Sequence, residues 1–152
     1  MHAMLRSDGL PRATVDRLAR EAMEVLQRML SDDVGVWVLS SHADATSEFS
    51  LTTASPSETA DTTIRADRVF RAGSDPGGPG EEFLWIIDYK TSAHSVAGLE
   101  IFLQRQREVY AEQLQAYADS LAPVWGVDSQ HVRVGLYFPA IPRLLWWSPE
   151  TK

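Results

Sequence analysis

The stretch FLWIIDYKTS, residues 83–92 of this 152-residue chain, changes from apolar to charged residues within a few positions. Its apolar run LWII, residues 84–87, is typical of a strand that is buried on both faces of a sheet. The run ends in Asp88, Tyr89 and Lys90, so an acid and a base close the most hydrophobic strand of the chain. Because side chains alternate along a strand, Asp88 and Lys90 are expected on one face and Tyr89 on the other.

The elements on both sides of this strand follow from the spacing of apolar residues. Helical spacing predicts helices over residues 12–30 and 99–122, the second ending near Pro123. Alternating segments predict four further strands, over 47–53, 62–70, 131–139 and 143–147. The connections are predicted as a passage into a loop over 36–45, a turn over 54–60 and a Gly/Pro-rich hairpin loop over 71–82. This order predicts one α/β or α+β domain with a mixed central sheet.

Charge and composition limit the function classes. The chain has a net charge of −7 and no cysteine. An acidic chain is unsuited to gripping nucleic acid by bulk electrostatics, and the lack of cysteine excludes disulfide frameworks and zinc–thiolate sites. No apolar run reaches the roughly 18 residues of a membrane span, so we expect a cytoplasmic protein with no membrane partner. Of the 14 basic residues only Lys90 and the C-terminal Lys152 are lysine.

An acid on a neighbouring strand suggests a metal site. If segments 62–70 and 83–90 pair antiparallel, Asp67 can lie beside Asp88. Two close carboxylates repel each other unless a cation lies between them, and Mg²⁺ accepts two acids, a backbone carbonyl and several waters. With Lys90 on the same face, such a site has what phosphodiester hydrolysis needs. The alternative is a solvated strand end for Asp88 and Lys90 and a surface acid for Asp67.

These residues, followed by the segments YAEQLQAYADSLA and VRVGLYFPAIPRL, resemble the RecB/AddA-type nuclease domain of the PD-(D/E)xK superfamily. In that family a strand aspartate, a D-Y-K-[TS] motif and a helical Q-x-x-x-Y signature follow one another in this order. The resemblance covers approximately residues 12–147. It implies an α/β fold with a restriction-endonuclease-like core, in which a central mixed sheet is flanked by helices.

The resemblance also implies roles for the residues of the strand ends. Asp67 and Asp88 match the metal-binding acids of the family, and the backbone carbonyl of Tyr89 matches a third ligand. Lys90 matches the catalytic lysine. The implied cofactor is Mg²⁺ or Mn²⁺.

Further residues match the family on the helix and on the first strand. Gln113 and Tyr117 match the helical signature and lie four residues apart, so they share one helix face with Tyr110. The resemblance suggests that Gln113 orients DNA or supports the site, whereas the alternative for this stripe is helix packing. Glu48 stands where relatives carry an acid, and is either an additional metal ligand or a solvent-facing acid. His42 could touch the metal, although a loop histidine usually does not.

The chain departs from the family pattern at its start. Members carry an upstream helix with a G-x-x-x-H motif whose histidine joins the metal site, but His2 has no glycine four residues before it. The chain also has no G-x-x-x-x-G-K-[ST] motif. We therefore expect residues 1–152 to be a single nuclease-like domain, the C-terminal part of an ATP-dependent helicase–nuclease with a UvrD/Rep-like motor. The histidine helix and the motor are expected upstream.

The expected function is metal-dependent hydrolysis of DNA, as an exonuclease acting on a single strand fed by a helicase during double-strand-break repair and recombination. The expected partners are single-stranded DNA, the helicase domain of the same polypeptide and a second helicase–nuclease subunit. Arg65 and Arg68 could meet phosphates or form surface ion pairs. One alternative is a degenerate nuclease fold that binds DNA or docks a subunit. Another is a protein-interaction domain that exposes Trp146 and Trp147.

Overall fold

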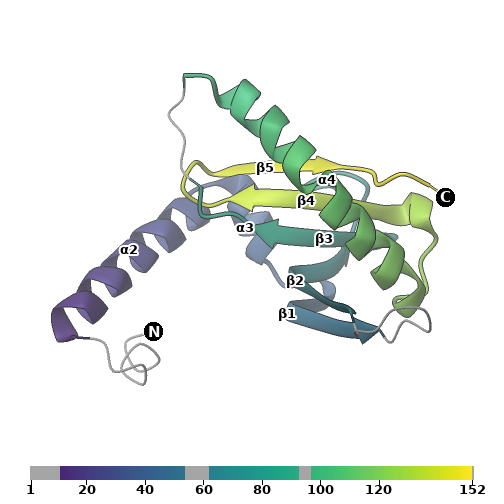
Figure 1. Ribbon diagram of the computed structural model, residues 1–152, viewed down its shortest axis with the longest axis horizontal. Helices are drawn as coiled ribbons and strands as arrows, with labels where there is room; N and C mark the ends of the chain where they lie inside the picture. Colours follow the sequence, from purple (N-terminus) through teal and green to yellow (C-terminus); the bar gives the residue numbers. More distant parts are fainter. Residues whose placement is uncertain (1–10, 54–61, 93–96, 152) are drawn as a thin grey trace.

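The structure, a computed structural model, describes residues 11–53, 62–92 and 97–151. Its centre is a five-stranded sheet in the order β1-β2-β3-β4-β5, flanked by helices (Figure 1). The α/β class and the mixed central sheet that the sequence predicts are therefore confirmed. The turn predicted over 54–60 and His2 lie outside the described residues.

Apart from α3 and a short 3₁₀ turn, the helices and strands agree with the predicted segments except at their ends. The helices are α2 (Arg12–Leu30), α3 (Asp33–Leu39) and α4 (Leu99–Val124), and a short 3₁₀ turn, η1 (Ser129–His131), follows them. The strands are β1 (Ala43–Thr53), β2 (Thr62–Ala72), β3 (Phe83–Tyr89), β4 (Val132–Phe138) and β5 (Arg143–Trp147). β1 begins earlier than predicted, and α4 includes Pro123 in its last turn.

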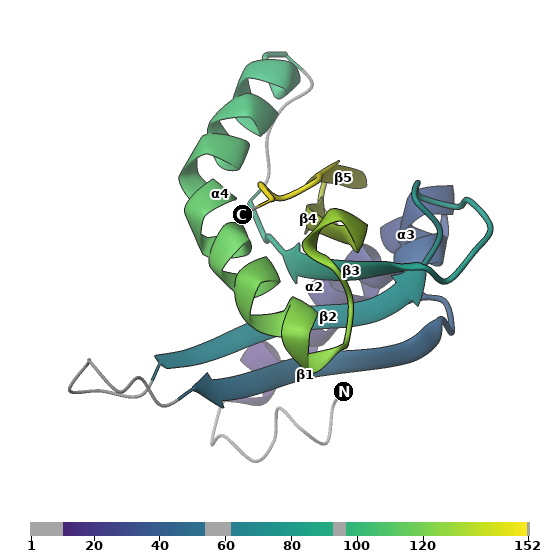
Figure 2. The same cartoon turned by 90° about the vertical axis from the view of Figure 1, so that its right-hand side faces the viewer.

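The sheet is mixed because one connection crosses over it. β1, β2 and β3 form an antiparallel meander, whereas β4 pairs parallel with β3 and antiparallel with β5. Parallel neighbours cannot be joined by a tight hairpin, and α4 supplies the crossover between β3 and β4. Figure 2 shows α4 lying across one face of the sheet, with its N-terminal half extending beyond the strands.

β3 is buried on both faces, as its apolar run predicts. Leu84, Trp85, Ile86 and Ile87 are each 0% exposed. Leu84 and Ile86 belong to a core that includes Leu114 of α4, so we name this side of the sheet the α4 face. Trp85 and Ile87 belong to a second core, which includes residues of α3 and the end of α2, and we name that side the α3 face.

α3 is a helix where the sequence predicted a passage into a loop. The side chain of Asp32 caps its start by accepting a hydrogen bond from the backbone N of Gly35, at 2.9 Å. Val38 is fully buried on the α3 face, and the Trp37 ring packs edge-on against Phe70. The prediction was wrong because valine and tryptophan favour strands and glycine disfavours helices, whereas here tertiary packing stabilises the helix.

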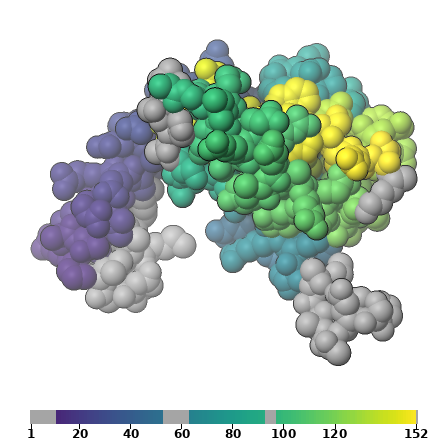
Figure 3. All heavy atoms as spheres, turned by 45° about the horizontal axis from the view of Figure 1, so that its top comes forward, coloured from purple at the N-terminus to yellow at the C-terminus, as the bar shows by residue number. Residues whose placement is uncertain are grey.

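α2 belongs to the same side of the molecule as α3. Its C-terminal end packs into the core of the α3 face through Met29 and Val25. Figure 3 shows the remainder of the helix reaching away from the body as an arm. The core beneath α4 is therefore built without α2.

Candidate active site

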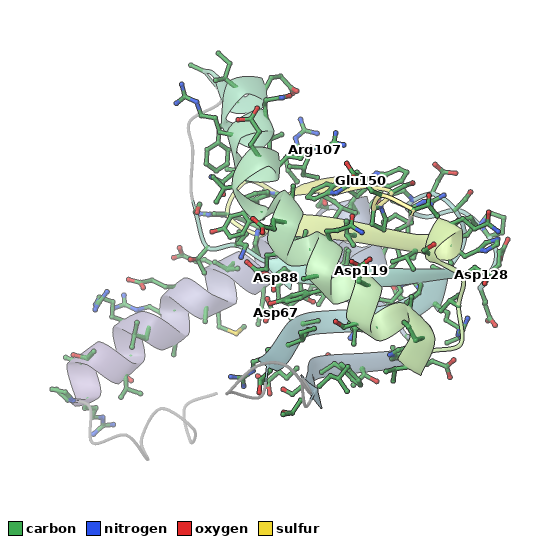
Figure 4. The ribbon with its side chains drawn as sticks, turned by 45° about the vertical axis from the view of Figure 1, so that its right-hand side comes forward. Asp67, Asp88, Arg107, Asp119, Asp128 and Glu150 are labelled. Atoms are coloured by element: carbon green, nitrogen blue, oxygen red, sulfur yellow. The ribbon has the colours of Figure 1, made fainter. Side chains whose placement is uncertain are left out.

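The candidate site forms where β2 and β3 stop pairing. The last pair in their antiparallel register is Arg68 with Ile87, so the next positions are Asp67 and Asp88. Facing positions of antiparallel strands share one face of a sheet. Figure 4 shows the two acids next to each other beside α4. The structure thus brings together the two carboxyl groups that the strand pairing predicted to be neighbours.

The side chain of Asp67 continues the hydrogen bonding between β2 and β3 beyond their last backbone pair. Its Oδ2 atom accepts a hydrogen bond from the backbone N of Tyr89, at 2.7 Å. This bond satisfies a strand donor that has lost its partner on β2. The Tyr89 side chain lies on the α3 face, and burial raises the pKa of its hydroxyl while Arg68 lowers it and Asp67 raises it. Asp67 therefore fixes the backbone that follows Asp88.

Asp88 is the only buried charged side chain among the residues that the structure describes, with 7% of its surface exposed. Burial raises the pKa of its carboxyl above the ordinary value of 3.8, the Lys90 ammonium lowers it, and the adjoining Asp67 carboxyl raises it. The resulting direction is upward, so burial and the neighbouring acid outweigh the lysine. The pair of acids is thus short of compensating positive charge.

Lys90 directs its ammonium group back toward this pair. Its Nζ atom lies 2.7 Å from Oδ2 of Asp88 and 3.8 Å from the centre of the Tyr110 ring on α4. Its backbone N donates a hydrogen bond to the carbonyl of Tyr137, at 2.8 Å, and so extends the contact between the β3 and β4 chains past the end of β3. Lys90 is thereby held at both its backbone and its side chain.

The helical signature residues contact each other. Gln113 is exposed, and its Nε2 donates a hydrogen bond to the Tyr117 hydroxyl at 2.7 Å. Leu114 and Ala118, which each follow one of these residues, are buried in the core of the α4 face, as the helix spacing predicts. Within the described part of the chain, no hydrogen bond joins Gln113 or Tyr117 to the two acids or to Lys90. Their link to the site is α4 itself, through Tyr110.

Glu48 and His42 do not join the two acids. Glu48 occupies the register position opposite Asp67, between the pairs Ser47–Arg68 and Phe49–Ala66, but its side chain is exposed. His42 stacks on Phe70 with ring centres 4.2 Å apart, and so lies with the residues of the α3 face. Among the described residues there is no group of three or more histidine, aspartate or glutamate side chains arranged to hold a metal.

The two arginines of β2 have different surroundings. Arg68 donates hydrogen bonds to the carbonyls of Val38 and Ser40, at 2.6 and 2.7 Å, where the last carbonyls of α3 need partners. It also donates to the Ser47 hydroxyl at 3.0 Å. The Arg68 guanidinium therefore has a structural role at the end of α3. This differs from the two roles considered from the sequence, a phosphate contact and a surface ion pair. Arg65 is exposed.

The tryptophans near the C-terminus do not form an exposed aromatic patch. Trp146 and Trp147 are both half-buried. Trp146 packs against Trp85 with ring centres 5.2 Å apart, and the Arg107 guanidinium lies 5.2 Å from the centre of the Trp147 ring. The feature that would favour a protein-docking tail is thus not present in this region.

Two tyrosines have surroundings that could not be predicted from the sequence. The helix spacing placed Tyr110 on the stripe of Gln113, but only the crossover geometry brings its ring to Lys90. Tyr137 is fully buried on the α3 face, and its hydroxyl has no hydrogen-bond partner among the described residues. Neither the helical spacing around Tyr110 nor the strand pattern around Tyr137 predicts these surroundings.

Comparisons with known proteins assign no family. No protein-family model matches the chain, and no curated protein shows significant similarity to it. Within the described residues, none of the helices has both the length and the apolar character that crossing a membrane requires.

Proposed function

We propose that this chain is a Mg²⁺- or Mn²⁺-dependent deoxyribonuclease domain with a PD-(D/E)xK core. The observation that carries the proposal is the cluster of Asp67, Asp88 and Lys90 at the end of the central strand. Two carboxyl groups adjoin there, and an ammonium lies 2.7 Å from one of them. The resemblance of the D-Y-K-T motif and of Gln113 and Tyr117 to the RecB/AddA-type nuclease domain supports this choice of chemistry.

The donor set fits a hard divalent cation. Asp67 uses Oδ2 for the Tyr89 N–H, and Asp88 uses Oδ2 for Lys90, so each carboxyl group keeps a second oxygen. One or two protein carboxylates suffice for Mg²⁺ when waters and a substrate phosphate complete its ligands. A cation also relieves the repulsion between two acids. The proposed ligands are Asp67, Asp88 and, by resemblance, the Tyr89 carbonyl.

Each residue then has a definite task. When bound, the cation supplies a Lewis acid and lowers the pKa of a water molecule. Asp67 also holds the backbone of Tyr89 in place through its hydrogen bond. Lys90 carries no ligand atom, and its ammonium stabilises the negative charge that develops on the phosphate in the transition state. The exposed Gln113 amide and its Tyr117 partner contact the DNA backbone, which positions the strand without reading its sequence.

The proposed substrate is a single DNA strand delivered by a helicase in the cytoplasm, during repair and recombination of double-strand breaks. A helicase domain of the same polypeptide and a second helicase–nuclease subunit are the proposed partners. A net charge of −7 is compatible with this arrangement, because the motor would provide most of the grip on DNA.

A second candidate is a degenerate nuclease fold that binds DNA or docks a subunit without cleaving. One observation favours it: within the described residues the two acids are not joined by a third metal-ligating side chain. In this case Lys90 would serve as the permanent counter-ion of Asp88.

The test is a Mn²⁺ titration of the chain with a fluorescently labelled single strand, paired with calorimetric measurement of Mn²⁺ binding. Wild type should bind Mn²⁺ weakly and cleave the strand slowly, because two carboxylates and one carbonyl are few protein ligands for the cation. Lys90→Ala should lower cleavage by roughly 100-fold or more while Mn²⁺ binding persists, because the lysine acts on the transition state. Asp88→Asn should lose both cleavage and Mn²⁺ binding, because a neutral amide replaces one of the two anionic ligands.

The matched control is Asp128→Asn, which removes an exposed acid far from Asp67 and Asp88 (Figure 4). It should behave as wild type in both assays. Equal cleavage by wild type and Lys90→Ala would exclude the proposed mechanism. Mn²⁺ binding without cleavage by wild type would favour the degenerate fold instead.

A further inference from the structure

The Lys90 ammonium lies between two groups of different chemistry. On one side is the Asp88 carboxylate, 2.7 Å away, and on the other is the face of the Tyr110 ring, 3.8 Å from Nζ to the ring centre. The Lys90 side chain is 16% exposed, so this contact is largely shielded from water. Tyr110 itself packs against the core of the α4 face.

These two neighbours differ in what they can do during the proposed reaction. An Asp88 carboxylate that ligates a cation shares its charge with that cation, and its hold on Lys90 weakens. The Tyr110 ring has no ligand atom and keeps its attraction for the ammonium, because the negative face of an aromatic ring attracts a cation. A lysine side chain has several freely rotating bonds, so a fixed contact at its tip restricts the positions that its amine can take.

We propose that Tyr110 is a positioning residue that holds the Lys90 ammonium beside the two acids through the face of its ring. The role of Lys90 rests on the proposed nuclease function, whereas the contact itself does not. The proposal extends the function of α4: Gln113, which bonds Tyr117, is exposed, and Tyr110, one turn earlier, orders the lysine. The ring, and not the hydroxyl, makes the contact with Lys90.

The kinetic test compares two replacements of Tyr110 with a control on the same helix. Tyr110→Leu keeps an apolar side chain but removes the ring, and should lower kcat by roughly three- to thirty-fold with little change in KM for the single strand. Tyr110→Phe keeps the ring and should stay within about two-fold of wild type. The control is Phe102→Leu, which removes a half-buried ring of the same helix that packs on Phe138.

The spectroscopic test uses the small number of lysines. The chain has only Lys90 and the C-terminal Lys152, so ¹³C-labelled lysine gives two sets of side-chain signals. The Hε protons of Lys90 should be shifted upfield by the ring current of Tyr110, and those of Lys152 should not. The shift should persist in Tyr110→Phe and in Phe102→Leu, and disappear in Tyr110→Leu.

The two tests separate the failure of this inference from the failure of the proposed function. Unshifted Lys90 signals in the wild type would overturn the inference, as would wild-type kcat in Tyr110→Leu. Equal losses of kcat in Tyr110→Leu and Phe102→Leu would reduce Tyr110 to core packing and also overturn it. A shifted Lys90 signal in a wild type that does not cleave DNA would overturn the proposed function and the catalytic part of the inference, and leave the contact established.

Discussion

At the scale of single residues, ionisation of the buried Asp88 carboxyl lowers the stability of the folded chain. Burial raises the pKa of its carboxyl in the folded chain. A carboxyl whose pKa is higher in the folded than in the unfolded chain weakens folding once the pH rises through that pKa, because the unfolded chain then ionises more easily. A buried ionisable carboxyl contributes nothing to the packing of a hydrophobic core. The position of Asp88 beside a second acid and a lysine is what the proposed metal site requires.

Tyr137 leads to a prediction on pH dependence. Burial raises the pKa of its hydroxyl to about 12, with Asp32 and Tyr89 adding to the shift, and the ordinary value is 10.0. Between these two values the unfolded chain releases the proton and the folded chain keeps it, so stability falls as the pH rises. Tyr137→Phe should remove this loss. At pH 8 the variant should be as stable as wild type or more stable by about 1 kcal/mol, because the buried hydroxyl has no partner among the described residues.

Urea unfolding of both proteins at pH 8 and at pH 11 measures this difference. The advantage of Tyr137→Phe over wild type should grow between the two pH values, and other alkaline effects cancel because they are common to both proteins. A variant that loses more than about 1 kcal/mol at pH 8 would show that the hydroxyl makes a favourable hydrogen bond, contrary to the prediction.

At the scale of elements, the position of α3 depends on one glycine. A Cβ atom at Gly35 would collide with the backbone carbonyl of Met29 and would lie 2.6 Å from the Tyr137 hydroxyl. Gly35→Ala should therefore destabilise the chain by about 1–3 kcal/mol, although alanine favours helices in general. Thermal or urea unfolding at neutral pH measures the loss.

Two further variants show whether the close approach is the cause. Val36→Ala changes an exposed neighbour on the same helix and should cost little. Adding Tyr137→Phe to Gly35→Ala should recover only part of the loss, because the Met29 carbonyl belongs to the backbone and cannot rotate away. Wild-type stability in Gly35→Ala would mean that α3 packs less closely against β4 than the structure describes.

The elements that the sequence predicts well are those in which the spacing of apolar residues indicates which side chains are buried. The continuous apolar run of β3 predicts a strand covered on both faces, and the helical spacing of α4 predicts the buried Leu114 and Ala118. The helix α3 was not predicted because its residue types favour a strand. Its helical form depends on packing against residues distant in the sequence, such as Phe70. The start of β1 was missed because that strand opens with alanine and aspartate, which have low strand propensity.

In the candidate site, too, some contacts could be predicted from the sequence and others could not. The adjacency of Asp67 and Asp88 follows from strand pairing alone, since facing positions share a side of the sheet. The contact of Tyr110 with Lys90 could not be predicted, because it depends on where the crossover sets α4 above the strand ends. Glu48 does not follow strand alternation because its φ of 54° lies in the left-handed region, which interrupts a regular strand.

At the scale of the whole molecule, the net charge of −7 opposes binding to a phosphate backbone. Proteins that hold DNA without help from a metal neutralise several phosphates with lysine and arginine, and their affinity falls steeply with salt. In this chain Arg68 bonds the end of α3 and Arg71 pairs with Asp44, so neither presents a free guanidinium. A cation held by Asp67 and Asp88 would instead supply local positive charge.

DNA binding should therefore depend on the divalent cation more than on salt. We expect Mn²⁺ to tighten binding of a fluorescent single strand by roughly ten-fold, measured by anisotropy in the Lys90→Ala background, where cleavage is suppressed. Sodium chloride at matched ionic strength should give no such gain, because screening weakens repulsion but creates no bridge to phosphate. Adding Asp88→Asn should abolish the Mn²⁺ effect, whereas adding Asp128→Asn should preserve it, since Asp128 lies far from the two acids. Equal tightening by Mn²⁺ in all three proteins would mean that the cation only screens the acidic surface.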